Sequence, residues 1–151
     1  FDVLGLRFVP IPVMHGKERI YGFRFENVAY LTDHSDVPEE SMAKLGELDV
    51  LFLDALRHRE HPTHSTVAHS GEMARRLGAR RTFFTHMCHD LMHEETEKSL
   101  PEGMHLAYDG LEIKVHAAAC GRSGLWRRSR RTSGLPFLLL EISTGCMRGI
   151  V

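Results

Sequence analysis

The sequence predicts an α/β fold in which helices pack against a sheet. Short apolar segments typical of strands alternate along the chain with segments that have helical patterning, and this alternation favours a layered α/β architecture. Val50 to Leu53 is continuously apolar, as expected for a strand buried on both faces of a sheet. Several of these apolar segments run directly into a histidine or an aspartate, among them His15, Asp33 and His86.

Strands are expected first along the chain. Residues 6–13 are apolar but contain two prolines, which suits an edge strand because proline cannot donate a ladder hydrogen bond. Residues 20–25 and 28–31, separated by two residues, predict a β-hairpin. Asp33 then lies just beyond the second strand of that hairpin.

Helices are predicted in three segments. Residues 35–45 have an acidic first turn after a proline and end before Gly46. A second helix, capped by Ser65 or Thr66, is expected to run to Leu77 and to end before Gly78. A third helix is expected over residues 90–98.

The remaining strands follow the second helix. Residues 81–85 predict a strand that leads into His86. Residues 106–115 carry an Asp-Gly pair between apolar flanks, and this pattern predicts a second hairpin.

The patterning changes after His116. We expect one domain over residues 1–116 and a disordered tail over residues 117–151, because much of the tail is rich in glycine, serine and arginine. Within the tail, Phe137 to Leu140 is expected to be an exposed apolar segment without a partner strand.

Composition narrows the classes of function. A net charge of -1 gives no general attraction to nucleic acid, and no apolar segment approaches the roughly 20 residues that span a membrane. Three cysteines, odd in number and widely spaced, offer no disulfide framework, and no signal-peptide pattern is present. We therefore expect a cytoplasmic protein without nucleic-acid or membrane partners. Whether the protein forms a homo-oligomer remains open.

Histidine is the compositional outlier. The chain has 11 histidines, and residues 58–93 contain most of them. Neutral imidazole is the commonest metal ligand in proteins and also serves acid/base catalysis. The crowding favours a metal or acid/base site.

Six motifs occur in an order that resembles a known family. From about residue 6 to residue 115 the chain resembles the C-terminal half of a metallo-β-lactamase-fold hydrolase, and within that superfamily it is similar to the phosphoribosyl cyclic phosphodiesterases. The resemblance implies a partial αβ/βα sandwich. Its motifs are His15-Gly16-Lys17, Leu31-Thr32-Asp33 with Val37-Pro38-Glu39, Leu53-Asp54-Ala55-Leu56-Arg57, His61-Pro62-Thr63-His64, Thr85-His86-Met87-Cys88-His89-Asp90 and Tyr108-Asp109-Gly110-Leu111.

The resemblance implies a site for two divalent metal ions, zinc or manganese. His15 would be a ligand of the first ion, Asp33 the bridging carboxylate and His86 a ligand of the second. His64 would contact phosphate and protonate a leaving oxygen, so that His64 and Asp33 are the candidate catalytic residues. His89 is a further candidate ligand.

The roles of two further residues, Asp54 and His34, are left open. Asp54 ends a buried strand and could orient a ligand histidine from behind. His34 adjoins Asp33 and could point toward a substrate, although adjacent side chains in an extended segment usually point to opposite sides.

The functional hypothesis is a fragment of a binuclear metal-dependent phosphodiesterase that acts on a small cyclic nucleotide or sugar phosphate. Such families also use a His-x-His-x-Asp-His motif, which this sequence does not contain, so we expect the chain to be inactive by itself and whether it is an enzyme stays open. The alternatives are a histidine-rich metal-binding protein without catalysis, and a truncated gene product without a function of its own.

Overall fold

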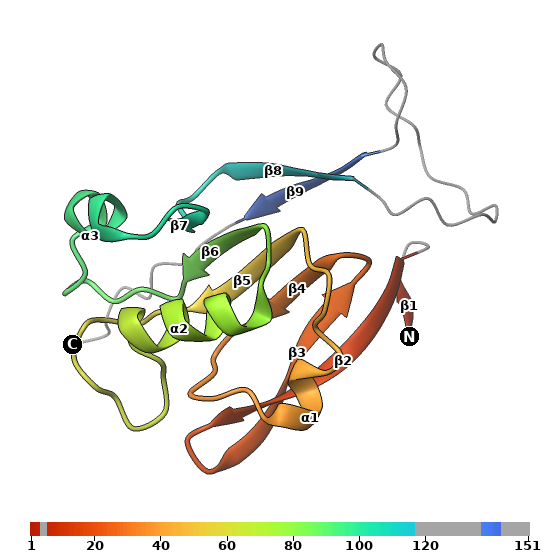
Figure 1. The fold of residues 1–151 in the computed structure, drawn as a ribbon, viewed down its shortest axis with the longest axis horizontal. Coiled ribbons are helices and arrows are strands. Elements are labelled where there is room, and N and C mark those ends of the chain that lie inside the picture. Colours follow the sequence, from red (N-terminus) through yellow and green to blue (C-terminus); the bar gives the residue numbers. More distant parts are fainter. Residues whose placement is uncertain (4–5, 117–136, 143–151) are drawn as a thin grey trace.

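The fold is built around one mixed sheet. The computed structural model describes residues 1–3, 6–116 and 137–142. Within these ranges, seven strands lie side by side in chain order (Figure 1). Pairing is antiparallel from the first strand to the fourth and parallel from the fourth to the seventh. The strands are β1 (Asp2–Val3), β2 (Leu6–His15), β3 (Glu18–Phe25), β4 (Val28–Leu31), β5 (Val50–Asp54), β6 (Arg81–Thr85) and β7 (Met104–Leu106).

The antiparallel part confirms two predictions. β2 pairs with β3 along most of its length but with β1 only at Leu6 and Arg7, so its prolines lie on a largely open edge, where a missing N–H leaves no ladder bond unmade. β3 and β4 form the predicted hairpin, closing with Phe25 opposite Val28.

The parallel part buries both faces of its central strand. All five residues of β5 are buried. Leu51 and Leu53 pack in the core beneath the helices, whereas Val50 and Phe52 pack in a second core on the other face. This two-residue alternation explains why the segment is continuously apolar.

The predicted α/β class is confirmed: two helices cover one face of the sheet, and a third lies beside the edge strand β7 (Figure 1). The helix over residues 66–77 is confirmed: the Thr66 side chain accepts a hydrogen bond from the His69 N–H, and Gly78 ends the helix in the left-handed conformation. The other two helices are shorter than expected. Within the described ranges no helix is long and apolar enough to cross a membrane. The helices are α1 (Glu39–Met42), α2 (Val67–Leu77) and α3 (His93–Ser99).

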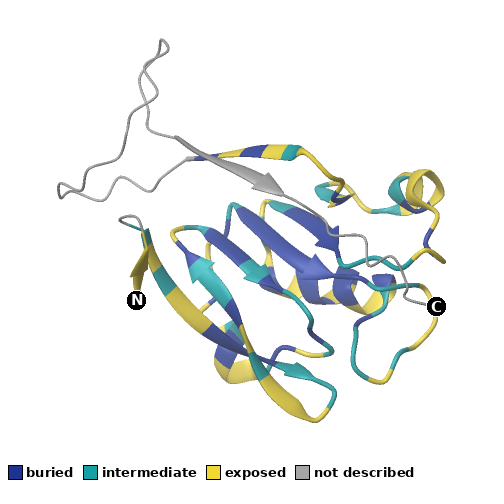
Figure 2. Ribbon diagram, turned by 180° about the vertical axis from the view of Figure 1, so that it is seen from behind, coloured by how far each residue is buried: buried dark blue, intermediate teal, exposed yellow. Residues whose placement is uncertain are grey.

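A separate strand pair lies over the other face of the sheet. β8 (Leu111–His116) pairs antiparallel with β9 (Phe137–Ile142), and Ile113 and Val115 of β8 pack in the second core. Figure 2 shows that the central strands are buried while much of β8 and α3 is exposed.

Two sequence predictions need correction here. The hairpin over residues 106–115 is wrong, because Leu106 pairs with Phe84 of β6 and the Asp-Gly turn instead connects two different sheets. Phe137 to Leu140 was expected to have no partner strand, yet these residues pair with β8. The rest of residues 117–151 lies outside the described residues, so the domain boundary at 116 remains a prediction.

Close packing between β3 and β4 predicts that replacing Gly22 by a larger residue destabilises the fold. A Cβ at Gly22 would lie 2.6 Å from Leu31 Cδ2 and 2.8 Å from Tyr30 O, so the backbone would have to shift. We expect Gly22→Ala to lower the free energy of unfolding by about 1–3 kcal/mol in chemical denaturation. Gly46→Ala is the control, since a Cβ there meets nothing within 4 Å. Equal losses in the two variants would contradict this packing.

Candidate functional site

The candidate site lies where the parallel strands end. Asp33 follows β4, Asp54 is the last residue of β5 and His86 directly follows β6. The carboxyl ends of parallel strands meet at one edge of a sheet, which is where ligands bind in open α/β sheets. His86 has a φ of 58°, a left-handed conformation uncommon outside glycine, and such residues concentrate at functional sites.

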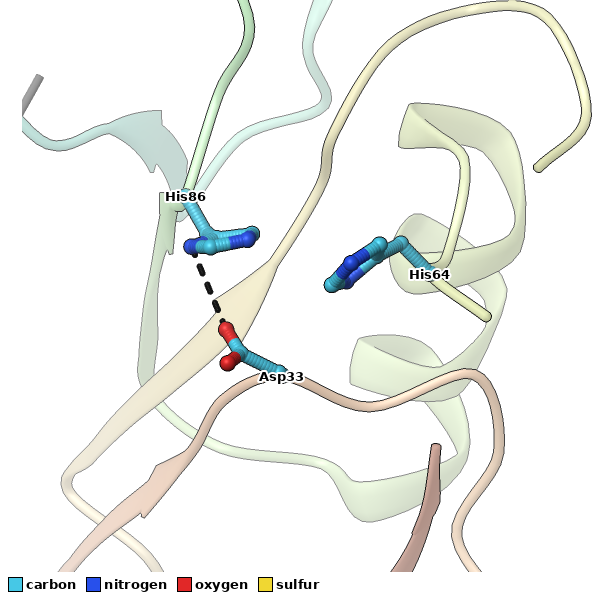
Figure 3. A group of neighbouring side chains, drawn as sticks. All are labelled: Asp33, His64 and His86. Carbon is cyan, nitrogen blue, oxygen red and sulfur yellow. Dashed lines mark ion pairs between the residues drawn. The ribbon is translucent and has the colours of Figure 1, made fainter. Parts of the chain in front are cut away.

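Asp33, His64 and His86 form a compact group of half-buried side chains. One nitrogen or oxygen atom from each lies within 4.8 Å of the others. His86 Nδ1 is 3.2 Å from Asp33 Oδ1, and the rings of His64 and His86 have centroids 4.9 Å apart. Figure 3 shows the three side chains converging on a common space from three different segments of the chain.

The loop that carries His64 is fixed by backbone hydrogen bonds on both sides. The Ser65 N–H donates to His34 O at 3.0 Å, and the Leu56 N–H donates to Ser65 O at 3.0 Å. The Cys88 N–H in turn donates to Leu56 O at 2.9 Å. The loops that carry Asp33, His64 and His86 are therefore joined to one another through the main chain.

His15 approaches the group from the end of β2. Ser35 ties this strand end to the Asp33 loop, because its Oγ accepts from the Gly16 N–H at 2.9 Å and donates to Met14 O at 3.0 Å. His15 Nε2 lies 3.4 Å from His64 Nε2. His15 is thus a direct neighbour of His64, while the compact group itself does not include it.

Behind His64 lies a buried carboxylate. Asp54 and His34 are both 0% exposed. Asp54 Oδ1 accepts a hydrogen bond from the His34 backbone N–H at 2.8 Å and also contacts His34 Nδ1. Asp54 Oδ2 lies 3.5 Å from His64 Nδ1. His34 therefore points into the protein toward Asp54, which settles its open interpretation against substrate contact.

The surroundings of His64 change its acid/base behaviour. Burial lowers the pKa of His64, because the imidazolium form loses hydration, and the Asp54 carboxylate acts in the opposite direction. The neighbouring rings of His86 and His15 add to the lowering. His64 is consequently held mainly as neutral imidazole near pH 7.

The structure separates the remaining predicted residue from the group. The side chain of His89 is 94% exposed and pairs with Asp90 at 3.2 Å, so it is not brought to Asp33, His64 and His86. Conversely, the sequence analysis assigned no role to His61, although its ring centroid lies 5.0 Å from that of His64. The three-residue spacing within His61-Pro62-Thr63-His64 was the available signal.

Within the compact group, Asp33 and His86 are spaced to bind one divalent ion. Ligand atoms about 2.0–2.1 Å from tetrahedral zinc lie roughly 3.3 Å from one another, and the Asp33 to His86 separation of 3.2 Å has this size. Imidazole and carboxylate donors suit zinc and manganese. Two ions need more ligands than the group supplies.

Comparison with known sequences places this geometry in a family. Residues 1–87 match the family described as the beta-lactamase superfamily domain. The chain is also 34% identical over 117 residues to a Porphyromonas gingivalis protein named octanoyltransferase. That match covers 76% of this chain and 24% of the relative, so the chain spans about a quarter of that protein's length.

Two solved structures share the fold. A diphosphatase from the PhnP family is 55% identical, with a TM-score of 0.72, and the match covers 74% of this chain and 44% of the diphosphatase. The metallo-β-lactamase fold protein YhfI from Bacillus subtilis is 18% identical with a TM-score of 0.62, covering 74% of this chain and 50% of YhfI. The second likeness concerns the fold alone.

The compact group predicts which residue matters most for metal binding. Replacing Asp33 by Ala should weaken zinc or manganese binding by at least about 10–100-fold. Losses of this size follow from mutating a residue that only hydrogen-bonds to a metal ligand, whereas Asp33 would be a ligand itself. Isothermal titration calorimetry on the chain measures this change. His105→Ala is the control, because His105 pairs with Glu97 away from the group. Equal losses in the two variants would remove Asp33 from the site.

The lowered pKa of His64 predicts a pH dependence of stability. The unfolded chain takes up a proton at His64 near pH 6.5, the ordinary value, whereas the folded chain resists protonation until lower pH. Without metal, the free energy of unfolding should therefore fall as pH decreases below about 6.5. His64→Gln should show a shallower fall in denaturation curves recorded between pH 7 and pH 5. An unchanged slope would mean that burial does not perturb His64.

Proposed function

Since this chain belongs to the metallo-β-lactamase-fold hydrolases of the beta-lactamase superfamily, we propose that the whole protein is a metal-dependent phosphodiesterase. The substrate we propose is a small cyclic nucleotide or a sugar phosphate. The observation that carries the proposal is the convergence of Asp33, His64 and His86 on one space at the carboxyl edge of the sheet.

The similarity to the diphosphatase supports chemistry at phosphorus. At 55% identity over 74% of this chain, the two proteins share much of their sequence as well as their fold. A diphosphatase and a phosphodiesterase both cleave a phosphorus–oxygen bond, and both must neutralise charge that develops on phosphoryl oxygens. This likeness favours the phosphoribosyl cyclic phosphodiesterase type over other hydrolases of the superfamily.

Each residue of the group has a role in this proposal. Asp33 and His86 would hold metal, with His15 as a further ligand. Divalent ions held there would supply hydroxide near neutral pH and neutralise phosphoryl charge. His64 would contact the phosphate and, in its protonated form, deliver a proton to the leaving oxygen, since a lowered pKa makes the imidazolium a stronger acid.

The proposal concerns the whole protein rather than these residues by themselves. The chain spans 44% of the diphosphatase, and its sequence contains no His-x-His-x-Asp-His motif. Three ligands do not hold two ions, so the remaining ligands would come from a segment with that motif. We therefore expect the chain to hydrolyse substrate only when such a segment is supplied.

A second candidate is metal binding without catalysis. It is favoured by the cluster of imidazoles around His64, in which the His15, His61 and His86 ring centroids lie 4.8, 5.0 and 4.9 Å away. The two candidates differ in turnover. Metal uptake without hydrolysis, even with the missing ligands supplied, would favour this second candidate.

The test is an assay of cyclic nucleotide and sugar phosphodiester hydrolysis in zinc and in manganese. It compares the chain alone with the chain supplied with a segment that carries His-x-His-x-Asp-His. We expect hydrolysis in the second sample only. Absence of hydrolysis of all phosphorus esters in both, with metal bound, would overturn the proposal.

The proton-donor role of His64 predicts a separable effect. In the active sample, His64→Ala should reduce turnover by roughly 10²–10⁴-fold, while metal content measured by atomic emission stays unchanged. His105→Ala should change neither quantity. Loss of metal together with turnover would show that His64 is a ligand instead of the proton donor.

A further inference from the structure

We propose that His61 is a further substrate-contacting residue of the site: its ring presents an Nε2–H donor beside His64, and this donor binds an oxygen of the phosphoryl group of the substrate. The ligand is therefore a phosphorus oxyanion held by two neighbouring imidazoles instead of one. The inference rests on the proposed function and deepens it, because it names a second protein group that recognises the same phosphate.

The His61 ring carries its proton on Nε2. The backbone N–H of Thr63 donates to His61 Nδ1 over 3.4 Å, and the Thr63 hydroxyl oxygen lies 3.3 Å from the same nitrogen. A backbone N–H can only donate, so Nδ1 presents its lone pair. A neutral imidazole has a single N–H, and the hydrogen bond made by one ring nitrogen decides that the other carries the proton.

The Nε2–H of His61 is available to a ligand. Among the residues that the structure describes, the hydrogen bonds of this ring are those of Nδ1 with Thr63, which leaves Nε2 without an acceptor from the protein. The side chain is half-buried, so one part of the ring remains open to solvent. A ligand oxygen can therefore bind the Nε2–H without first breaking a hydrogen bond within the protein.

The segment that carries His61 is held in place by the turn between β2 and β3. A Cβ at Gly16 would lie 2.9 Å from Thr63 Cγ2 and 3.4 Å from Pro62 O, so this turn packs directly against residues 62 and 63. Thr63 in turn fixes the His61 ring through Nδ1. Because the donor is ordered before a ligand arrives, binding loses little conformational entropy.

The ring lies next to the residue that would protonate the leaving oxygen. The His61 ring centroid is 5.0 Å from that of His64, with the ring planes inclined at 39°. A phosphoryl group has several strong acceptor oxygens, so a phosphate in contact with His64 offers further oxygens to an adjacent donor. His61 donates as a neutral ring, and it therefore does not oppose protonation of His64 as a neighbouring cation would.

The consequence concerns binding more than proton transfer. His64 transfers the proton in the proposed reaction, whereas His61 holds a phosphoryl oxygen before and after the bond is cleaved. A hydrogen bond to an anionic oxygen is stronger than one between neutral groups, and its loss should weaken phosphate binding by roughly tenfold or more. In a hydrolysis assay, this loss should raise KM more than it lowers kcat.

The first measurement is nuclear magnetic resonance of the ¹⁵N-histidine-labelled full chain at a pH where His61 is neutral. We expect the His61 signals, assigned by their loss in His61→Gln, to show the proton on Nε2 in the metal-free chain. Adding inorganic phosphate to the zinc-loaded chain should shift the Nε2 signal of His61 and leave the signals of His69, exposed on α2, in place. A proton on Nδ1 of His61, or no shift with phosphate, would overturn the proposal.

The second measurement is the affinity of the zinc-loaded full chain for inorganic phosphate in isothermal titration calorimetry. His61→Phe keeps an aromatic ring but has no donor, and it should weaken binding by roughly tenfold or more. His61→Gln keeps an N–H donor at the end of its side chain and should retain most of the affinity. His69→Phe makes the same change on the surface of α2 and should leave the affinity unchanged.

The outcomes separate this inference from the proposed function. Phosphate binding that falls in His61→Phe and not in His69→Phe supports the contact, whether or not the whole protein proves to be a phosphodiesterase. Equal affinity in folded His61→Phe and wild type contradicts it even if hydrolysis is found, and so does a zinc-loaded chain that binds no phosphate. If His61→Phe does not fold, the phosphate-induced shift of the wild-type His61 signal decides.

Discussion

The buried carboxylate of Asp54 is the constraint on which the candidate site depends. It ends the central parallel strand, has no exposure to solvent, and contacts His34 from the loop after β4 and His64 from the loop before α2. A buried acceptor left without a donor typically costs about 1–3 kcal/mol, and more when the group is charged. The carboxylate therefore favours the one arrangement of these two loops in which both histidines face it.

Main-chain hydrogen bonds extend this arrangement to the whole sheet edge. Ser35 joins the end of β2 to the loop after β4, and Ser65 joins that loop to the segment after β5. The Cys88 N–H joins the loop after β6 to Leu56 O. Because each connection uses backbone groups or a short hydroxyl side chain, these four segments have little freedom to separate. The side chains of His15, Asp33, His64 and His86 are consequently held close together before any ligand binds, which reduces the ordering cost of binding.

Much of this arrangement was predictable, and the exceptions have physical causes. Local signals were sufficient for the β3–β4 hairpin and for α2, where Thr66 and Gly78 mark the ends, and the order of the motifs identified the fold and the group around Asp33. The Asp-Gly turn before β8 misled, because a turn signal does not say whether its flanking strands pair with each other. The partner of residues 137–140 and the inward direction of His34 depend on contacts between distant segments, which no local pattern encodes.

The central claim is that Asp33 and His86 bind metal at the carboxyl edge of the sheet. The most direct test is a crystal structure of the protein grown with manganese or zinc, with anomalous diffraction recorded at the absorption edge of the metal. The account predicts an anomalous peak about 2.0–2.2 Å from the carboxylate oxygen of Asp33 and from a ring nitrogen of His86. A fully occupied metal bound elsewhere, for example at His89 and Asp90, with no peak between Asp33 and His86, would contradict it.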